Sequence, residues 1–248
     1  MGLRTMERRR LHRDVMAEFV AEIVSGRLAP GDALPREVAV AERFGISRGI
    51  ARECLRALEE RGLATVRHGS KTTVNPREDW DLFDPDVIAA SLAGPGAVAL
   101  LGEYIECRRI VEIEAAGFAA ERATADDVAA LEARFEEMKA ALATKGAAAQ
   151  EAAYHAADVA FHTQLVHATG NLALLTLVRR VDTALLVARY PLARPAYRRT
   201  RALPEHEAIL VAVREGNPDA ARAAMRAHLD TVESYLHEHA RQVARSAA

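Results

Sequence analysis

The chain has 248 residues, half of them hydrophobic and 27% charged, which allows one large folded domain or two smaller ones. Its two cysteines make no disulfide framework, nothing near the start reads as a signal peptide, and the longest apolar runs are too short to cross a bilayer. We therefore expect a cytoplasmic protein with no membrane association. Residues 1–77 carry 15 Lys and Arg against 10 Asp and Glu, while residues 78–248 carry 18 against 25, so the basic N-terminal part is predicted to bind a polyanion.

Residues 1–76 are predicted to form three short helices followed by a small β-hairpin. Helical spacing of apolar residues, with a glycine after each segment, places the helices at 10–25, 36–44 and 48–61. β-Prone residues at 64–66 and 72–74 flank the glycine that makes the hairpin turn. Three helices and a hairpin on a basic unit are the layout of a winged helix-turn-helix, which is a DNA-binding fold.

The third predicted helix carries a stripe of arginines. Arg48, Arg52 and Arg56 are spaced at i, i+4 and i+8, so they share one helix face near the helix N-terminus. Such a face can enter a major groove and reach guanine edges or phosphates. The spacing leaves a solvated charged face open as the alternative.

The rest of the chain is predicted to be helical, so the fold class is mainly α. Residues 77–94 contain Pro85 and several aspartates, and we interpret them as a linker with a short helix near 86–93. Residues 95–248 are predicted to form an all-α helical bundle with helices at 97–122, 125–143, 147–169, 171–190, 199–215 and 218–243. One of the breaks between these helices is the proline-bounded stretch 191–195.

Four residues of this helical part have the types and spacing of a metal site. Asp158 and His162 lie four residues apart on one helix face. His206 and His228 lie equally far from the turn at 216–218, so an antiparallel helix pair brings their imidazoles to the same height. One Asp and three His suit zinc or another divalent first-row metal, such as manganese or nickel. Polar packing in a helical core is the alternative.

Residues 26–74 resemble the DNA-binding domain of GntR-type bacterial transcription regulators. The resemblance rests on a series of segments in order and without gaps: Gly26-Arg27-Leu28-Ala29-Pro30-Gly31-Asp32, Leu34-Pro35, Ala41-Glu42-Arg43-Phe44-Gly45-Ile46-Ser47-Arg48, Ala51-Arg52-Glu53, Leu55-Arg56-Ala57-Leu58 and Gly62-Leu63. It implies that Arg48 and Arg52 contact operator DNA, with His68 and Gly69 of the wing at a minor groove. Arg56 and Lys71, a predicted phosphate contact, complete the DNA-binding set.

Three positions depart from the family pattern. The family usually has a capping Ser where this chain has Arg36, so a helix cap of about 1 kcal/mol is missing or replaced. A DNA-contacting Arg of the family is replaced by Val38, and Gly49 stands unusually in a first helical turn. We therefore expect an operator that differs from the common one of the family.

Residues 79–243 resemble the FCD effector domain of the FadR-like GntR subfamily. The matching segments include Arg108 to Ala123, Asp158-Val159-Ala160-Phe161-His162, Gly170-Asn171, Glu205-His206 and His228-Leu229. The metal-binding branch of that subfamily uses an Asp and three His at the positions of Asp158, His162, His206 and His228, which implies a metal cofactor, with zinc expected.

The same resemblance indicates an effector site. Arg108 lies on the helix whose Arg, in the family, meets an effector carboxylate, and an Arg fork binds a carboxylate bidentately. The alternative for Arg108 is a salt bridge to Glu112, four residues on. Asn171 is a second candidate for effector binding, although its position also suits a helix cap.

These features predict a ligand-responsive transcription regulator. We expect a repressor that binds an inverted-repeat operator as a homodimer and responds to a small organic acid bound near the metal. A regulator that senses the metal itself is one alternative. A metallohydrolase is another, but no candidate general base lies beside the metal ligands by spacing, and a DNA-binding unit would be unexplained.

Overall fold

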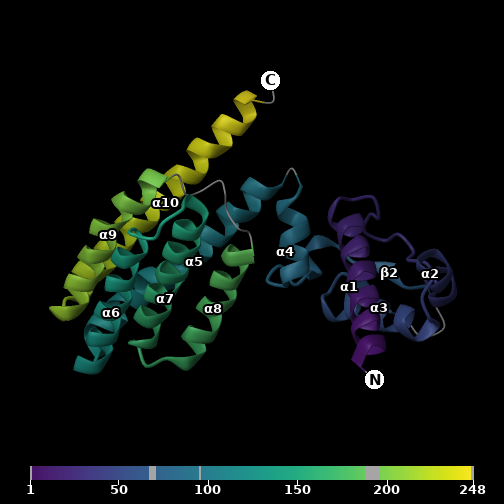
Figure 1. The fold of residues 1–248 in the computed structure, drawn as a ribbon, viewed down its shortest axis with the longest axis horizontal. Helices are drawn as coiled ribbons and strands as arrows, with labels where there is room; N and C mark the ends of the chain where they lie inside the picture. The colour runs from purple at the N-terminus through teal and green to yellow at the C-terminus, as the bar shows by residue number, and fades with distance from the viewer. Residues whose placement is uncertain (1, 67–70, 95, 188–195, 247–248) are drawn as a thin grey trace. The chain divides into compact units, whose positions relative to one another are not determined.

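The computed structural model describes residues 2–66, 71–94, 96–187 and 196–246. The chain divides into two compact units, Met1–Ala97 and Val98–Ala248, and each has its own hydrophobic core (Figure 1). The fold is mainly helical with one two-stranded antiparallel sheet, as the sequence predicted. Among the described residues, no helix combines the length and the apolar composition needed to cross a membrane.

The first unit is a winged helix-turn-helix. Its elements are α1 (Gly2–Val24), α2 (Glu37–Phe44), α3 (Arg48–Glu60), β1 (Ala64–Thr65) and β2 (Thr73–Val74). The strands pair with Ala64 opposite Val74, so the predicted hairpin is confirmed, although each strand has only two residues. The hairpin tip with His68 and Gly69 lies outside the described residues.

The turn between α2 and α3 is made by local signals in the sequence. Gly45 ends α2 with φ of 63°, a left-handed conformation that favours glycine. Ser47 then starts α3, because its hydroxyl accepts a hydrogen bond from the backbone N–H of Ile50. At the start of α2, Arg36 occupies the N-cap position and makes no side-chain cap hydrogen bond, so the expected loss of a cap is confirmed.

The segment expected to be a linker is packed into the first unit. It contains a short 3₁₀ turn, η1 (Arg77–Asp79), and helix α4 (Pro85–Leu92), which Asp84 caps. Val87 is fully buried in the core of the first unit, where α4 packs against α1. Burial of this apolar face of α4 stabilises its packing against α1, so the segment is part of the first unit.

The second unit is a bundle of helices. They are α5 (Ala97–Arg122), α6 (Ala125–Ala141), α7 (Ala147–His167), α8 (Leu172–Val187), α9 (Ala196–Arg214) and α10 (Pro218–Ser246). In Figure 1, α7 and α8 lie side by side, and α6 packs against α7 as α9 packs against α10. Gly216 allows the tight turn between α9 and α10 with φ of 63°. The predicted break at 191–195 lies outside the described residues.

Candidate metal centre and nucleic-acid interface

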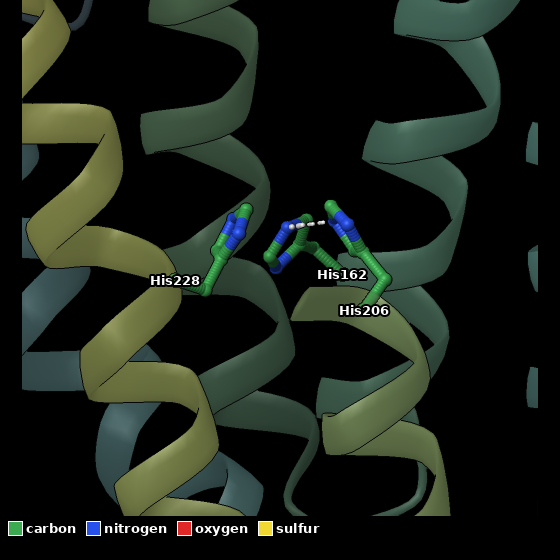
Figure 2. Close-up of side chains that lie close together, drawn as sticks. All are labelled: His162, His206 and His228. Atoms are coloured by element: carbon green, nitrogen blue, oxygen red, sulfur yellow. Dashed lines mark hydrogen bonds between the residues drawn. The ribbon is translucent and has the colours of Figure 1, made fainter. Parts of the chain in front are cut away.

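Three imidazoles from three helices meet inside the second unit. His162 of α7, His206 of α9 and His228 of α10 each offer a ligand atom, and these atoms all lie within 4.8 Å of one another. Figure 2 shows the three rings turned toward a common point. Each of the three residues is at most 2% exposed, so this is an interior site. The antiparallel α9–α10 pair thus brings His206 and His228 together, as their spacing predicted.

Asp158, the fourth predicted ligand, lies at the same centre. Its Oδ1 is 3.3 Å from Nε2 of His206, and the same nitrogen is 3.3 Å from Nε2 of His162. Two ligand atoms that share a metal with bonds of about 2.0–2.2 Å at a tetrahedral angle are separated by roughly 3.4 Å. The three imidazoles fit a divalent first-row metal ion, and Asp158, in contact with His206, can add a carboxylate oxygen.

The other nitrogen of each imidazole faces an oxygen of the protein. Nδ1 of His206 donates to the backbone carbonyl of Ala202 at 2.8 Å, and Nδ1 of His228 donates to Glu205 at 2.9 Å. Nδ1 of His162 lies 2.9 Å from Oε2 of Glu112. The partners of His206 and His228 set the tautomer and orient the ring, and they leave Nε2 with its lone pair for a metal. Nδ1 of His162 is close to Glu112 but makes no hydrogen bond to the described residues.

Burial keeps the imidazoles of His162 and His228 in the form that binds metal. It lowers the pKa of His162 below the ordinary value. Burial, together with the neighbouring His206 and His162, holds the pKa of His228 well below that value. The two rings are therefore neutral at neutral pH, and no proton has to leave before a cation binds.

Arg108 of α5 lies at the edge of this centre and is buried. Its Nε donates to Glu112 at 2.6 Å and its Nη2 donates to the second oxygen at 3.1 Å, while Nη2 is 3.5 Å from Nε2 of His162. Burial acts to raise the pKa of Glu112, but Arg108 and His162 together outweigh it, hold the pKa well below its usual range and keep this carboxyl ionised. The salt bridge that the sequence suggested is thus present and buried, with the guanidinium beside the candidate metal ligands.

A further carboxyl group, Asp182 of α8, faces the same region. It is only 5% exposed, and burial raises its pKa to about 7, with Glu112 adding to the shift and Arg108 opposing it. Asp158 and Glu112 oppose the guanidinium of Arg108, and Asp182 is partly ionised at neutral pH, so these four groups together have an excess of negative charge. Buried charge needs compensation, so the cluster favours a bound cation.

Asn171 has a structural role in this bundle. Its Oδ1 accepts a hydrogen bond from the backbone N–H of Leu174 at 3.0 Å, which caps the start of α8. The side chain is exposed at the surface of the second unit. The capping alternative therefore describes what Asn171 does in the structure, and its contact with an effector stays a prediction.

The predicted arginine stripe lies on the exposed face of α3. Arg48, Arg52 and Arg56 all point away from the core, which the opposite face of the helix meets with Ile50, Ala51, Cys54, Leu55, Ala57 and Leu58. Arg52 is held by a bidentate ion pair to Glu37 of α2, at 2.9 and 3.2 Å. The hydrogen bond from Arg52 lowers the pKa of Glu37, and the charges of the whole stripe act in the same direction.

Two other positions near this surface bear on DNA binding. Lys71, beside the hairpin strand β2, is exposed and available to a phosphate. The family resemblance leads us to expect an arginine at position 38, where this chain has valine. Val38 is 41% exposed, so α2 presents an apolar side chain there. Lys71 and Val38 both lie in the first unit.

Sequence reasoning missed three residues of these sites. Glu205 is named only as part of the segment Glu205-His206, and the pairing of Glu37 with Arg52 is not predicted. Asp182 was not singled out, although it continues the apolar stripe of Leu175 and Val178 at helical spacing, and an acid on such a stripe is a signal.

Comparisons with known proteins agree with this two-part architecture. Residues 11–74 match the profile of bacterial regulatory proteins of the gntR family, and residues 103–231 match the FCD domain. The chain is 31% identical to the galactonate operon transcriptional repressor of Escherichia coli K12, over 82% of the chain and 86% of the repressor. It is 34% identical to the HTH-type transcriptional regulator LutR of Bacillus subtilis, over 86% of the chain and 95% of LutR.

A solved structure shows the same fold. It is that of Lar, which controls the expression of the Listeria monocytogenes agr system, with a TM-score of 0.63 and 18% identity over 92% of this chain and 96% of Lar. A winged helix-turn-helix followed by a helical FCD domain defines a DNA-binding, ligand-responsive transcription regulator. The chain belongs to the GntR family of bacterial regulatory proteins, in the group with an FCD domain. It is a regulator and not an enzyme, so the metallohydrolase alternative is set aside.

Proposed function

We propose that this protein is a repressor that binds an inverted-repeat operator as a homodimer and is controlled by a small carboxylate bound beside a metal ion. The observation that carries the proposal is the convergence of three Nε2 atoms and Asp158 next to the guanidinium of Arg108. The first unit supplies the DNA contacts and the second supplies the control site.

Zinc is the metal that we expect, with manganese or nickel as alternatives. The donor set would be Asp158, His162, His206 and His228, and the imidazoles of His206 and His228 are already oriented by their Nδ1 partners. When bound, the metal would offer a positive centre for a carboxylate in any coordination position that the protein leaves open.

The effector is proposed to be an organic acid whose carboxylate lies between the metal site and Arg108. Two cationic groups at one place favour an anion, and the guanidinium binds carboxylates with directional hydrogen bonds. To bind the effector, Arg108 has to share its N–H donors between the effector carboxylate and Glu112. One relative is named for the galactonate operon, and galactonate is a carboxylate, which supports this effector class.

The operator contacts are proposed to come from α3 and the wing. Arg48, Arg52 and Arg56 would enter the major groove, with Lys71 on a phosphate and His68 and Gly69 at the minor groove. Arg52 keeps its direction through Glu37 in the DNA-free protein. One recognition helix reads only a short half-site, which is why two copies on an inverted repeat are proposed.

The test combines metal analysis with effector titration of the full-length protein. We expect purified wild type to contain about one metal ion per chain, and His206→Ala to lose both the metal and the affinity for organic acids while operator binding is retained. His237→Ala, which removes an exposed imidazole from α10, is the matched control. Arg108→Ala should keep the metal and lose the acid. A metal-free wild type that still binds its acid tightly would contradict the proposal.

A metal sensor is the second candidate. The observation in its favour is that Asp158 lies beside the three clustered imidazoles, so the protein itself could supply four ligands, which a tetrahedral metal needs without an effector atom. Operator affinity measured with and without added zinc, in the absence of any organic acid, separates the two. A large change with zinc alone favours the sensor, while a change that requires the acid favours the effector-controlled repressor.

A further inference from the structure

Asp182 occupies a turn of α8 that faces the control site. Leu175 and Val178 of α8 pack against Ala115 of α5 and Val166 of α7. One turn further along α8 comes Asp182, and one turn back along α7 comes His162. Since α7 and α8 are consecutive, adjacent and joined by a short turn, these two steps run in the same spatial direction. Asp182 therefore lies in the layer of the bundle that holds the candidate metal ligands.

The electrostatic environment of Asp182 agrees with that placement. Its carboxyl is influenced by the charges of Glu112, Arg108 and Asp158, which come from α5 and α7. In turn, the charge of Asp182 acts to raise the pKa of Arg108. Three helices thus contribute charged side chains to one buried cluster.

The carboxyl of Asp182 lacks a partner in this cluster. Its Oδ2 is shielded from solvent and accepts no hydrogen bond from any residue that the structure describes. A buried polar atom without a hydrogen bond is costly, and in a native protein such an atom points to a bound group or an ordered water. The neighbouring Arg108 donates to Glu112 instead, so the described residues leave Oδ2 of Asp182 without a hydrogen bond.

We propose that Asp182 is a specificity-determining residue, which accepts a hydrogen bond from a hydroxyl or ammonium group of the effector. The inference rests on the proposed function, in which the effector carboxylate lies between the metal site and Arg108. Asp182 then selects acids that carry a hydrogen-bond donor near the carboxylate, and it disfavours acids that offer only methylene groups there, because those leave the buried carboxyl unpaired.

The test uses acids of one carbon skeleton that differ only in the donor. Zinc-loaded full-length protein is titrated calorimetrically with propionate, lactate and alanine, then with succinate, malate and aspartate, and with hexanoate and gluconate. In at least one series, wild type is expected to bind a donor-bearing acid about 10- to 100-fold more tightly than the plain acid. In Asp182→Leu this advantage should fall to about onefold, with zinc content unchanged.

Asp182→Asn distinguishes a hydroxyl donor of the effector from an ammonium donor. An amide oxygen still accepts from a hydroxyl, so preference for a hydroxy acid survives in part, whereas preference for an ammonium is lost with the charge. Thr183→Ala, at the exposed neighbouring position of α8, is the control and should behave as wild type. Circular dichroism and operator binding check that each variant is folded.

Two outcomes in the Asp182→Leu variant would overturn the assignment of Asp182. One is an unchanged preference in Asp182→Leu, and the other is loss of zinc from that variant, which would make Asp182 a metal ligand. Equal binding of all members of every series by wild type also overturns it, while leaving the proposed function intact. Failure of every acid to bind zinc-loaded wild type refutes the proposed effector class itself.

Discussion

Replacing Glu205 with alanine tests whether the histidine cluster is organised for metal binding. Glu205 accepts the Nδ1 proton of His228 at 2.9 Å, and the His228 side chain is only 3% exposed, so water cannot easily take over this role. Without the acceptor, the ring loses its fixed orientation. It also loses the nearby negative charge that makes Nε2 a better electron-pair donor to a metal. Loss of such an outer partner costs about 10- to 100-fold in metal affinity, or about 1.4–2.7 kcal/mol.

The assay for Glu205→Ala is competition for zinc against a chromophoric chelator at pH 7.5. Wild type, Glu205→Ala and the exposed control Glu207→Ala are compared at equal protein concentration. Glu207→Ala should match wild type, because it removes the same charge from the same helix without touching His228. Equal zinc affinity in all three proteins would refute the idea that Glu205 holds a metal ligand.

Two other predictions concern DNA binding and pH. Arg52→Ala should weaken specific operator binding by about 1–3 kcal/mol and relax sequence preference, whereas Lys71→Ala should weaken binding to all sequences and reduce the salt slope by about one. Fluorescence anisotropy with operator and scrambled duplexes checks both, and an unchanged preference in Arg52→Ala would mean that the stripe is only solvated. In metal-free protein, burial raises the pKa of Asp182 to about 7 from 3.8, so the folded state binds more protons and ionisation of Asp182 destabilises it as pH rises toward 7. The stability advantage of Asp182→Asn over wild type, measured by urea unfolding, should therefore be larger at pH 8 than at pH 5.5 by about 2 kcal/mol, and equal advantages would contradict this.

Much of the first unit was predictable because its signals are local. A glycine that adopts positive φ after α2 and a serine that caps α3 act within a few residues of their own position, so they are readable without knowledge of distant contacts. The same holds for the arginine stripe, since helical periodicity alone separates the exposed face of α3 from its buried face. The expected linker was different, because the burial of Val87 depends on contact with α1, far away in the chain.

In the candidate metal centre, too, some contacts could be predicted from the sequence and others depend on tertiary packing. The equal distance of His206 and His228 from one turn made their meeting predictable, because a helix hairpin relates residues by rise alone. The pairing of His228 with Glu205, the contact of Arg108 with His162, and the burial of an unpaired Asp182 depend on how α5, α7, α8, α9 and α10 pack around one centre. Periodicity in a sequence shows which face of a helix is buried but not which helix covers it, so these partners emerged only from the packed bundle.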